Sequence, residues 1–292
     1  MILKYNDKVH GYWLDGKRCK GVSSLAKIPD NDYSLDQWRK RMVAIGVANN
    51  LDLSQEIVHA ELAGDTSLLN ELAEQAMTEA GAHLAAEAGT AAHDRTEKHD
   101  TGQAVEETYE LHLARWRALL DYAGLDIEPD LAERCIIYPE RKICGRFDRL
   151  ARRRSDGKLA CIDLKTGKNA VKYPHATAVQ LALYARAPLM AGELERTSPP
   201  EMTCPRCDGN AVDREHYGSC DQCGGDGIVP APFEGFTETF TPLPDDLDQQ
   251  VGYMLHLPDS GEDRIYAISL GHGWQVANEV VFPTLAWRAT PT

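Results

Sequence analysis

The chain has 292 residues and a formal net charge of −14. This length allows one large domain with a sizeable core, or two modest ones. No apolar run is long enough for a membrane span, and no basic-then-apolar leader opens the sequence. We therefore expect a soluble, cytoplasmic protein without a membrane partner, whose acidic total argues against nucleic-acid binding through overall charge.

The first part of the chain predicts a hairpin followed by helices. Residues 12–17 carry a probable turn at Asp15-Gly16, between segments rich in aromatic and apolar residues. Further on, residues 68–92 and 106–122 space their apolar side chains at helical intervals. These stripes are more typical of core packing than of a cofactor site.

From residue 133 the pattern changes to strands separated by polar turns. Residues 143–150 and 159–164 form two apolar stretches joined by a polar turn at 153–157. If these strands pair in an antiparallel hairpin, Asp148 and Asp163 lie near each other. Strand side chains alternate between faces, so Asp163 and Lys165 share one side while Leu164 points into the core.

Two carboxylates and one amine in a small volume suit a hard cation. Mg²⁺ or Mn²⁺ takes oxygen ligands and keeps several waters, so Asp148, Asp163 and the carbonyl of Leu164 form a sufficient protein contribution. Such an ion activates a water and stabilises charge on phosphate oxygens. Lys165 would position or deprotonate that water. This set indicates a metal-dependent nuclease.

A helix carrying Gln180 and Tyr184 one turn apart follows these strands. The ordered set resembles the PD-(D/E)xK nuclease superfamily, specifically its RecB-like branch of phage-type exonucleases. The resemblance implies an α/β, restriction-endonuclease-like core with a mixed central β-sheet flanked by helices. It makes Asp148 and Asp163 metal ligands and Lys165 the catalytic lysine, and it gives Gln180 and Tyr184 the task of orienting the site and touching nucleic acid.

The same resemblance extends to an earlier helix. The segment from Gly89 to His93 matches the family's Gly-x-x-x-His motif, which implies that His93 is a further metal ligand. Glu97, one turn later, also fits the family's pattern. Without the downstream motifs, a single histidine on an alanine-rich helix would be read as structural.

Basic residues concentrate in the segment that carries these motifs. Residues 141–172 contain eleven lysines and arginines against three aspartates. Phosphate binding depends on such a local field rather than on the total charge. Because no recognition-helix signature appears, we expect DNA to be held mainly through its phosphate backbone, with little reading of bases.

Four cysteines form a separate motif: Cys204, Cys207, Cys220 and Cys223. Two Cys-x-x-Cys pairs at this separation can close a tetrahedral Zn²⁺ site, and a module this small depends on its metal for folding. The alternative is an iron–sulfur cluster, which some RecB-like nucleases hold with one cysteine before the motifs and three after. Cys19 lies before them, but the four late cysteines form a complete set, which favours zinc.

These expectations combine into one domain with an insertion. Residues 1–197 and 231–292 would form the nuclease domain, and residues 198–230 a zinc-ribbon-like insertion able to contact a protein partner. The expected function is metal-dependent hydrolysis of DNA, which the resemblance makes an exonuclease of recombination, repair or phage DNA processing. The alternative is a catalytically silent DNA-binding or adaptor protein that uses this fold as a scaffold.

Overall fold

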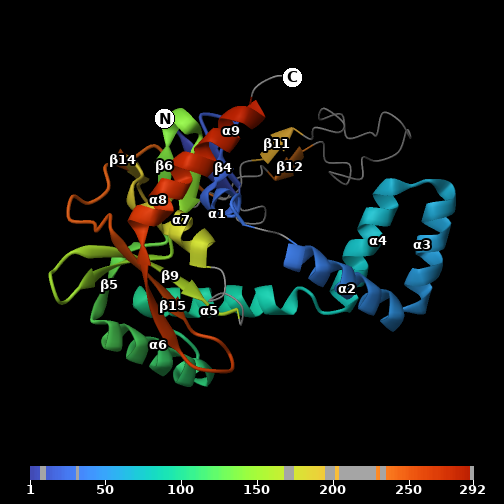
Figure 1. Ribbon diagram of the computed structural model, residues 1–292, viewed down its shortest axis with the longest axis horizontal. Coiled ribbons are helices and arrows are strands. Elements are labelled where there is room, and N and C mark those ends of the chain that lie inside the picture. The colour runs from blue at the N-terminus through green and yellow to red at the C-terminus, as the bar shows by residue number, and fades with distance from the viewer. Residues whose placement is uncertain are drawn as a thin grey trace.

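The computed structural model describes residues 1–6, 11–30, 33–167, 174–194, 201–203, 228–230 and 235–289. Most of the described chain forms a body of β-sheets and helices, from which a group of three helices projects (Figure 1). Among the described residues, no helix is long and apolar enough to cross a membrane. The four cysteines of the predicted zinc site lie outside the described residues.

The N-terminal strands form sheet I, in the order β13-β1-β2-β3 with antiparallel neighbours. The predicted hairpin is confirmed, because Asp15 and Gly16 connect β2 to β3 with φ values of 48° and 76°. Two successive positive φ angles suit the tight turn of a two-residue hairpin. The strands are β1 (Leu3–Asn6), β2 (Gly11–Leu14), β3 (Lys17–Arg18) and β13 (Gly235–Thr237).

Sheet II packs against sheet I through a small apolar core that includes Leu3, Tyr12 and Ile137. Its order is β14-β10-β6-β7-β4, and β4 runs parallel to β7. The strands are β4 (Lys20–Gly21), β6 (Cys135–Tyr138), β7 (Ile143–Arg146), β10 (Leu189–Ala191) and β14 (Phe240–Thr241).

Sheet III is the mixed sheet that the sequence predicts, in the order β16-β15-β9-β8-β5. The β8–β9 hairpin is antiparallel, and β15 adds to β9 in parallel. The strands are β5 (Leu125–Ala132), β8 (Arg149–Arg153), β9 (Leu159–Lys165), β15 (Val251–His256) and β16 (Arg264–Ser269).

One predicted strand is wrong: residues 143–150 form two strands, β7 in sheet II and β8 in sheet III. The chain changes sheets at Phe147 and Asp148. Phe147 is fully buried in the core, with its ring edge-on to that of Tyr184 at a centroid distance of 6.2 Å. Because this ring must enter the core, the strand breaks here, and Asp148 is placed at the junction of the two sheets.

Helices cover both faces of sheet III. Side chains of one face, including Leu150 and Cys161, pack with α1, α7 and the C-terminal helices, while Ile162 and Leu164 on the other face pack with α6. The helices are α1 (Val22–Ala26), α6 (Glu110–Ala123), α7 (Pro174–Ala185), α8 (Leu270–Val276), a π-helical turn (Ala277–Val281) and α9 (Phe282–Ala289).

The projecting helices form an arm joined to the body through α5 (Figure 1). The arm has its own small core, and α2 crosses α4 so closely that a Cβ at Gly46 would lie 1.7 Å from the carbonyl oxygen of Ala76. The helices are α2 (Tyr33–Asn49), α3 (Leu51–Ala63), α4 (Thr66–Glu79) and α5 (Leu84–Asp100).

The remaining described elements are short. The 3₁₀ turn η1 (Glu107–Tyr109) precedes α6, and η2 (Pro139–Arg141) connects β6 to β7. Strands β11 (Glu201–Thr203) and β12 (Ile228–Pro230) pair antiparallel on either side of residues 204–227.

Candidate active site

Helix α5 brings His93 to the junction of the two sheets. Gly89 is the point of closest approach, because a Cβ there would lie 3.1 Å from the hydroxyl oxygen of Thr166, just after β9. One turn later, His93 Nδ1 lies 3.5 Å from Asp148 Oδ2. The spacing of the Gly-x-x-x-His motif therefore has a steric reason: the glycine lets the helix approach β9, and the histidine then reaches the carboxylate.

Backbone groups hold Asp148 in position. The amide of Leu164 donates a hydrogen bond of 2.8 Å to Asp148 Oδ2, and the amide of Glu133 donates one of 2.9 Å to the Asp148 carbonyl. These bonds tie Asp148 to β9 and to the chain just before β6. Asp148 therefore lies against β9, the strand that carries Asp163, through a side-chain bond to the backbone of that strand.

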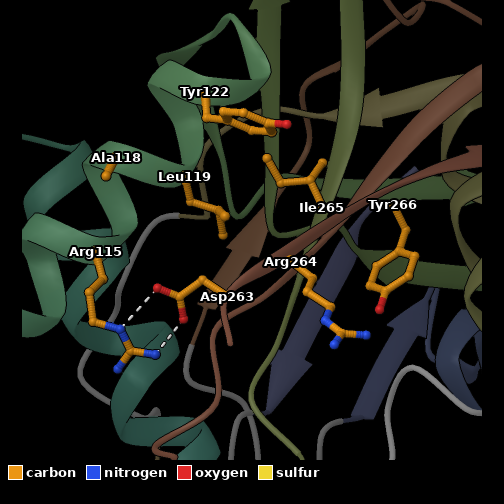
Figure 2. Close-up of a pocket in the computed structure, with 8 residues that line it drawn as sticks. All are labelled: Arg115, Ala118, Leu119, Tyr122, Asp263, Arg264, Ile265 and Tyr266. Atoms are coloured by element: carbon orange, nitrogen blue, oxygen red, sulfur yellow. Dashed lines mark hydrogen bonds and ion pairs between the residues drawn. The ribbon is translucent and has the colours of Figure 1, made fainter. Parts of the chain in front are cut away.

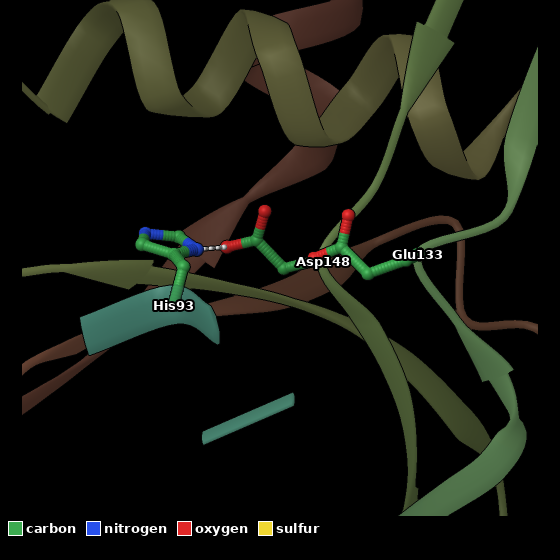
Figure 3. A group of neighbouring side chains, drawn as sticks. All are labelled: His93, Glu133 and Asp148. Atoms are coloured by element: carbon green, nitrogen blue, oxygen red, sulfur yellow. Dashed lines mark ion pairs between the residues drawn. The ribbon is translucent and has the colours of Figure 1, made fainter. Parts of the chain in front are cut away.

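Figure 3 shows a third side chain beside this pair, that of Glu133. His93, Glu133 and Asp148 each offer one ligand atom, and these atoms lie within 4.8 Å of one another. One imidazole nitrogen and two carboxylates suit Mn²⁺ or Mg²⁺, with water completing the shell. The donor set therefore fits the divalent metal that the fold family implies.

The electrostatics of Glu133 agree with a cation site. Burial and the charge of Asp148 raise the pKa of Glu133 to about 8, against the opposing effect of Arg146. Arg146 Nε lies 2.8 Å from a Glu133 carboxylate oxygen. Two carboxylates this close repel each other when both are ionised, and a bound cation removes that penalty.

Sequence reasoning missed Glu133, although a signal for it exists. Cys135 pairs with Arg146 across the β6–β7 hairpin. Continuing that antiparallel register by two residues in each direction brings Glu133 opposite Asp148. The β6–β7 register therefore identifies Glu133 as a neighbour of Asp148, once the two strands are known to pair.

Asp163 belongs to a second group of side chains beside the first. Lys165 Nζ lies 2.9 Å from Asp163 Oδ1 and 2.8 Å from Oδ2, and donates a hydrogen bond to Oδ1. Gln180 Nε2 lies 3.2 Å from Asp163 Oδ1 and 3.3 Å from the Tyr184 hydroxyl. The four predicted residues are thus in contact with one another.

Burial controls the charges in this second group. Burial raises the pKa of Asp163, and the nearby charge of Asp148 adds to the effect, although Lys165 opposes it. For Lys165, burial favours the neutral amine, but the charges of Asp163 and Asp148 outweigh it and raise the pKa. Lys165 is therefore an ammonium in the metal-free site. Asp163 Oδ2 is buried and accepts no hydrogen bond from any described residue.

The observed grouping differs from the predicted ligand set of His93, Asp148, Asp163 and the Leu164 carbonyl. His93 and Asp148 do lie together, with Glu133 as the third member of the group. The carboxylate of Asp163 turns to Lys165 and Gln180, and the group of Leu164 that contacts Asp148 is its amide.

A buried ion pair anchors α5 behind the site. Arg149, directly after Asp148, is fully buried, and its Nε lies 2.5 Å from Asp100 Oδ2 at the end of α5. Arg149 also donates a hydrogen bond of 2.7 Å to Thr96, and Trp116 donates one of 2.9 Å to Asp100. This network links the helix of His93 to the strand that follows Asp148.

The predicted basic field at the site is wrong for five of its arginines, because they form ion pairs. Arg146 and Arg149 pair with Glu133 and Asp100, as described above. Arg152 pairs with Glu128 and Asp246, Arg153 with Asp156 and Asp248, and Arg154 with Asp121 and Asp126. Arg146 lies on β7 of sheet II and the other four lie on or next to β8 of sheet III, so their pairing lowers the positive charge available to attract phosphate there.

The structure also has an open pocket of about 540 Å³ between α6 and β16, shown in Figure 2. An ion pair between Arg115 and Asp263 crosses it, and Tyr122, on α6, is largely exposed. None of the residues of the two groups above lines this pocket.

Comparison with known proteins assigns the family. No curated protein matches the chain. The family model described as PD-(D/E)XK nuclease superfamily matches residues 43–223, more than half of the chain. The matched region contains α5, β6 to β9 and α7, and therefore every residue of the two groups. The α/β architecture with its mixed sheet agrees with this assignment, and the chain belongs to the PD-(D/E)XK nuclease superfamily.

Proposed function

We propose that the protein is a Mg²⁺- or Mn²⁺-dependent deoxyribonuclease that removes nucleotides from DNA ends. The observation that supports it best is the convergence of His93, Glu133 and Asp148 on one point, beside the Asp163–Lys165 pair. Membership of the superfamily supports nuclease chemistry. Action at ends, the RecB-like branch, and a place in recombination, repair or phage DNA processing in the cytoplasm rest on motif resemblance.

His93, Glu133 and Asp148 would hold the cation, with Asp163 and the carbonyl of Leu164 completing its protein ligands. When bound, the ion supplies an activated water and stabilises charge on the phosphate oxygens. Asp163 Oδ2 accepts no hydrogen bond from a described residue, but it lies 2.8 Å from the Lys165 ammonium, so Lys165 would shift when this oxygen binds the cation. When the cation binds, the Glu133 carboxyl group would release its proton or move away from Arg146 to become a ligand.

Lys165 and its neighbours would align the reaction. With a raised pKa, Lys165 serves as a hydrogen-bond donor that positions the attacking water or a phosphate oxygen, rather than as a base. Gln180 fixes Asp163 and the Tyr184 hydroxyl together. Tyr184 has a raised pKa because it is buried, so it remains a neutral phenol able to donate to the DNA backbone.

The test is digestion of end-labelled linear DNA and closed circular DNA by the purified chain with Mg²⁺, Mn²⁺ or EDTA. Asp163→Ala is the inactive variant. Asp94→Ala is the matched control, because Asp94 lies on α5 but is exposed and pairs with Lys98. We expect metal-dependent loss of linear DNA alone, abolished only by Asp163→Ala. Cutting of circles would exclude strict end-dependence, and binding without cutting of any DNA would support the scaffold alternative.

For Cys204, Cys207, Cys220 and Cys223 we propose one structural Zn²⁺, in a module that can contact a protein partner. Elemental analysis of the purified chain distinguishes zinc from the iron–sulfur alternative. We expect one zinc per chain and no iron, with zinc lost in a Cys204→Ser/Cys207→Ser variant. Iron together with visible absorbance would contradict the proposal.

A further inference from the structure

Among the described residues, the arginines at positions 149 and 152–154 are paired, so sheet III offers little free positive charge beyond Lys165 for the phosphates of a longer substrate. A group of exposed basic side chains gathers instead at the β4 edge of sheet II. None of its members forms an ion pair with a described residue. We call it the β4-edge patch, made of Lys17, Arg18, Lys20, Arg141 and Lys142.

The fold assembles this patch from two distant parts of the sequence. Strand β4 pairs in parallel with β7, and the amide of Lys20 donates a hydrogen bond of 2.8 Å to the carbonyl of Lys142. Lys17 and Arg18 form β3, which directly precedes β4. Arg141 and Lys142 come from the η2 turn that precedes β7.

Two contacts hold arginines of the patch without neutralising them. The guanidinium of Arg141 lies 4.1 Å from the ring centroid of Phe282, and that of Arg18 lies 5.8 Å from the ring of Trp13. An aromatic face orients a guanidinium and leaves its charge in place. The described acids next to the patch in the sequence are Asp15, which accepts a hydrogen bond from the amide of Ile2, and the exposed Glu140. Five cations against these two acids leave a positive surface on a chain of net charge −14.

The patch is connected to the active site by short rigid segments. Lys142 lies six positions before Asp148, which limits their Cα distance to about 20 Å. Lys20 is two residues before Val22, which packs in the same core as Tyr184. A strand of nucleic acid leaving the site would therefore meet the patch within about six nucleotides, at the 3.4 Å rise per nucleotide of a duplex strand.

We propose that the β4-edge patch binds the phosphate backbone of the nucleic-acid strand that continues from the active site. This inference rests on the proposed nuclease function and extends its substrate contacts. Lysines bind phosphates as point charges and carry no sequence information. The surrounding negative charge of the protein confines the strand to this path. The patch makes the enzyme prefer substrates long enough to reach it.

The test compares cleavage of a 4-nucleotide and a 30-nucleotide end-labelled DNA by the full chain. The variants are Lys20→Glu/Lys142→Glu and a control, Lys158→Glu. Lys158 is also an exposed lysine at a strand turn, but it lies in the β8–β9 turn. We expect the double variant to lose tenfold or more in kcat/KM on the long DNA and to retain wild-type cleavage of the short DNA. Lys158→Glu should show no such difference between the two lengths.

Salt dependence gives a second readout that does not require cleavage. In an Asp163→Ala background, binding of the long DNA is measured against salt concentration. The slope of log Kd against log salt should fall by about two when the charges of Lys20 and Lys142 are reversed by substitution with Glu. An unchanged slope would overturn the proposed binding of phosphate by the patch. This outcome is distinct from failure of the proposed function, because the measurement does not require cleavage.

Two further outcomes would also overturn it. Equal loss on long and short DNA would mean that the variant damages the site itself. The projecting arm, residues 33–80, carries eight acidic and three basic residues, so a second copy of the chain is a competing occupant. If Lys20→Glu/Lys142→Glu loses a salt-sensitive self-association in light scattering while its DNA binding is unchanged, then the patch binds the arm of a second copy.

Discussion

Arg149 and Asp100 form a buried ion pair that joins the strand after Asp148 to the helix that carries His93. Arg149 is fully buried, the Asp100 side chain is 2% exposed, and the paired atoms lie 2.5 Å apart. The residues are 49 positions apart in the sequence. This contact therefore helps to hold His93 and Asp148 together, although neither Arg149 nor Asp100 belongs to the metal-binding group.

Arg149→Met should destabilise the protein by about 3–5 kcal/mol, because it leaves the Asp100 carboxylate buried without its partner. Adding Asp100→Asn removes that charge while keeping an acceptor for Trp116, so most of the stability should return. Mn²⁺ affinity should stay low in the double variant, since α5 has lost its link to β8. Urea unfolding and Mn²⁺ titration measure the two effects separately.

The control for this pair is Arg154→Met, whose partners Asp121 and Asp126 are exposed. Such surface pairs contribute little, so its unfolding curve should stay close to wild type. Recovery of both stability and Mn²⁺ affinity in the Arg149→Met/Asp100→Asn variant would show that the pair has only a general structural role.

Local features of the fold could be predicted from the sequence, whereas long-range pairings could not. The β2–β3 and β8–β9 hairpins depend on short polar turns, and the alternation in β9 correctly placed Leu164 in the core. Whether an arginine is free depends on partners far along the chain, as with Arg152 and Asp246, 94 residues apart. The sequence pattern showed the positive charges but not the carboxylates that meet them.

The same limit explains the candidate site. Asp163, Lys165, Gln180 and Tyr184 come from neighbouring elements, and their contact follows from local periodicity. Glu133 required the β6–β7 register, and that register was hidden because the strand after the turn was predicted to continue through Phe147. Burial of Phe147 in the core breaks that strand, and no local turn signal marks the break.

Gly145 is a position in the body with no room for a side chain. A Cβ there would lie 2.7 Å from the Val22 Cβ and 2.9 Å from a ring carbon of Tyr184. Gly145→Ala should destabilise the protein by about 1–3 kcal/mol and lower cleavage, because Tyr184 must move from its contact with Gln180. Thermal unfolding and the DNA digestion assay measure both effects.

A second substitution tests this steric account. Val22→Ala keeps the Cβ but removes Cγ2, one of the two Val22 atoms 2.7 Å from the added Cβ, so the Gly145→Ala/Val22→Ala variant should recover part of the lost cleavage. Gly21→Ala serves as the control, since the nearest atom to its Cβ is 3.9 Å away. A Gly145→Ala protein with wild-type stability and activity would show that Tyr184 has freedom that the packing does not suggest.

The raised pKa of Glu133 predicts how the metal-free protein responds to pH. Its pKa is about 8 in the folded state, against an ordinary value of 4.5. The folded state therefore keeps a proton that the unfolded state releases. The stabilisation is complete below about pH 4.5 and is lost as the pH rises to about 8, with a slope of at most about 1.4 kcal/mol per pH unit from this group.

Urea unfolding in EDTA between pH 5 and pH 8.5 measures this slope, and Glu133→Gln should flatten it. Asp163, whose pKa is also raised, contributes a slope of the same sign that remains in the variant. Saturating Mn²⁺ should reverse the trend, because the cation replaces the proton and binds more tightly as the pH rises. An identical slope in wild type and Glu133→Gln would contradict the assignment of Glu133.

Substitution of Lys165 tests metal binding and cleavage separately. Its ammonium contacts both oxygens of Asp163 but is not itself a metal ligand. Lys165→Met keeps the length of the side chain and removes its charge. Cleavage should fall by about 100-fold or more, the usual scale for a group that positions or transfers a proton. Mn²⁺ should still bind, with its affinity shifted to higher pH because Asp163 loses the cation that favours its ionised form.

The matched control is Lys98→Met, since Lys98 lies on α5 and pairs with the exposed Asp94. It should cleave DNA at the wild-type rate. Single-turnover cleavage and Mn²⁺ titration across pH separate the two roles of Lys165. If Lys165→Met cleaves normally, then Lys165 only neutralises Asp163 in the metal-free state, and alignment of the water must come from Gln180 and Tyr184. If cleavage and Mn²⁺ binding are lost together at every pH, then Lys165 is needed to keep the carboxylates able to bind the metal, and its role in the reaction itself is not supported.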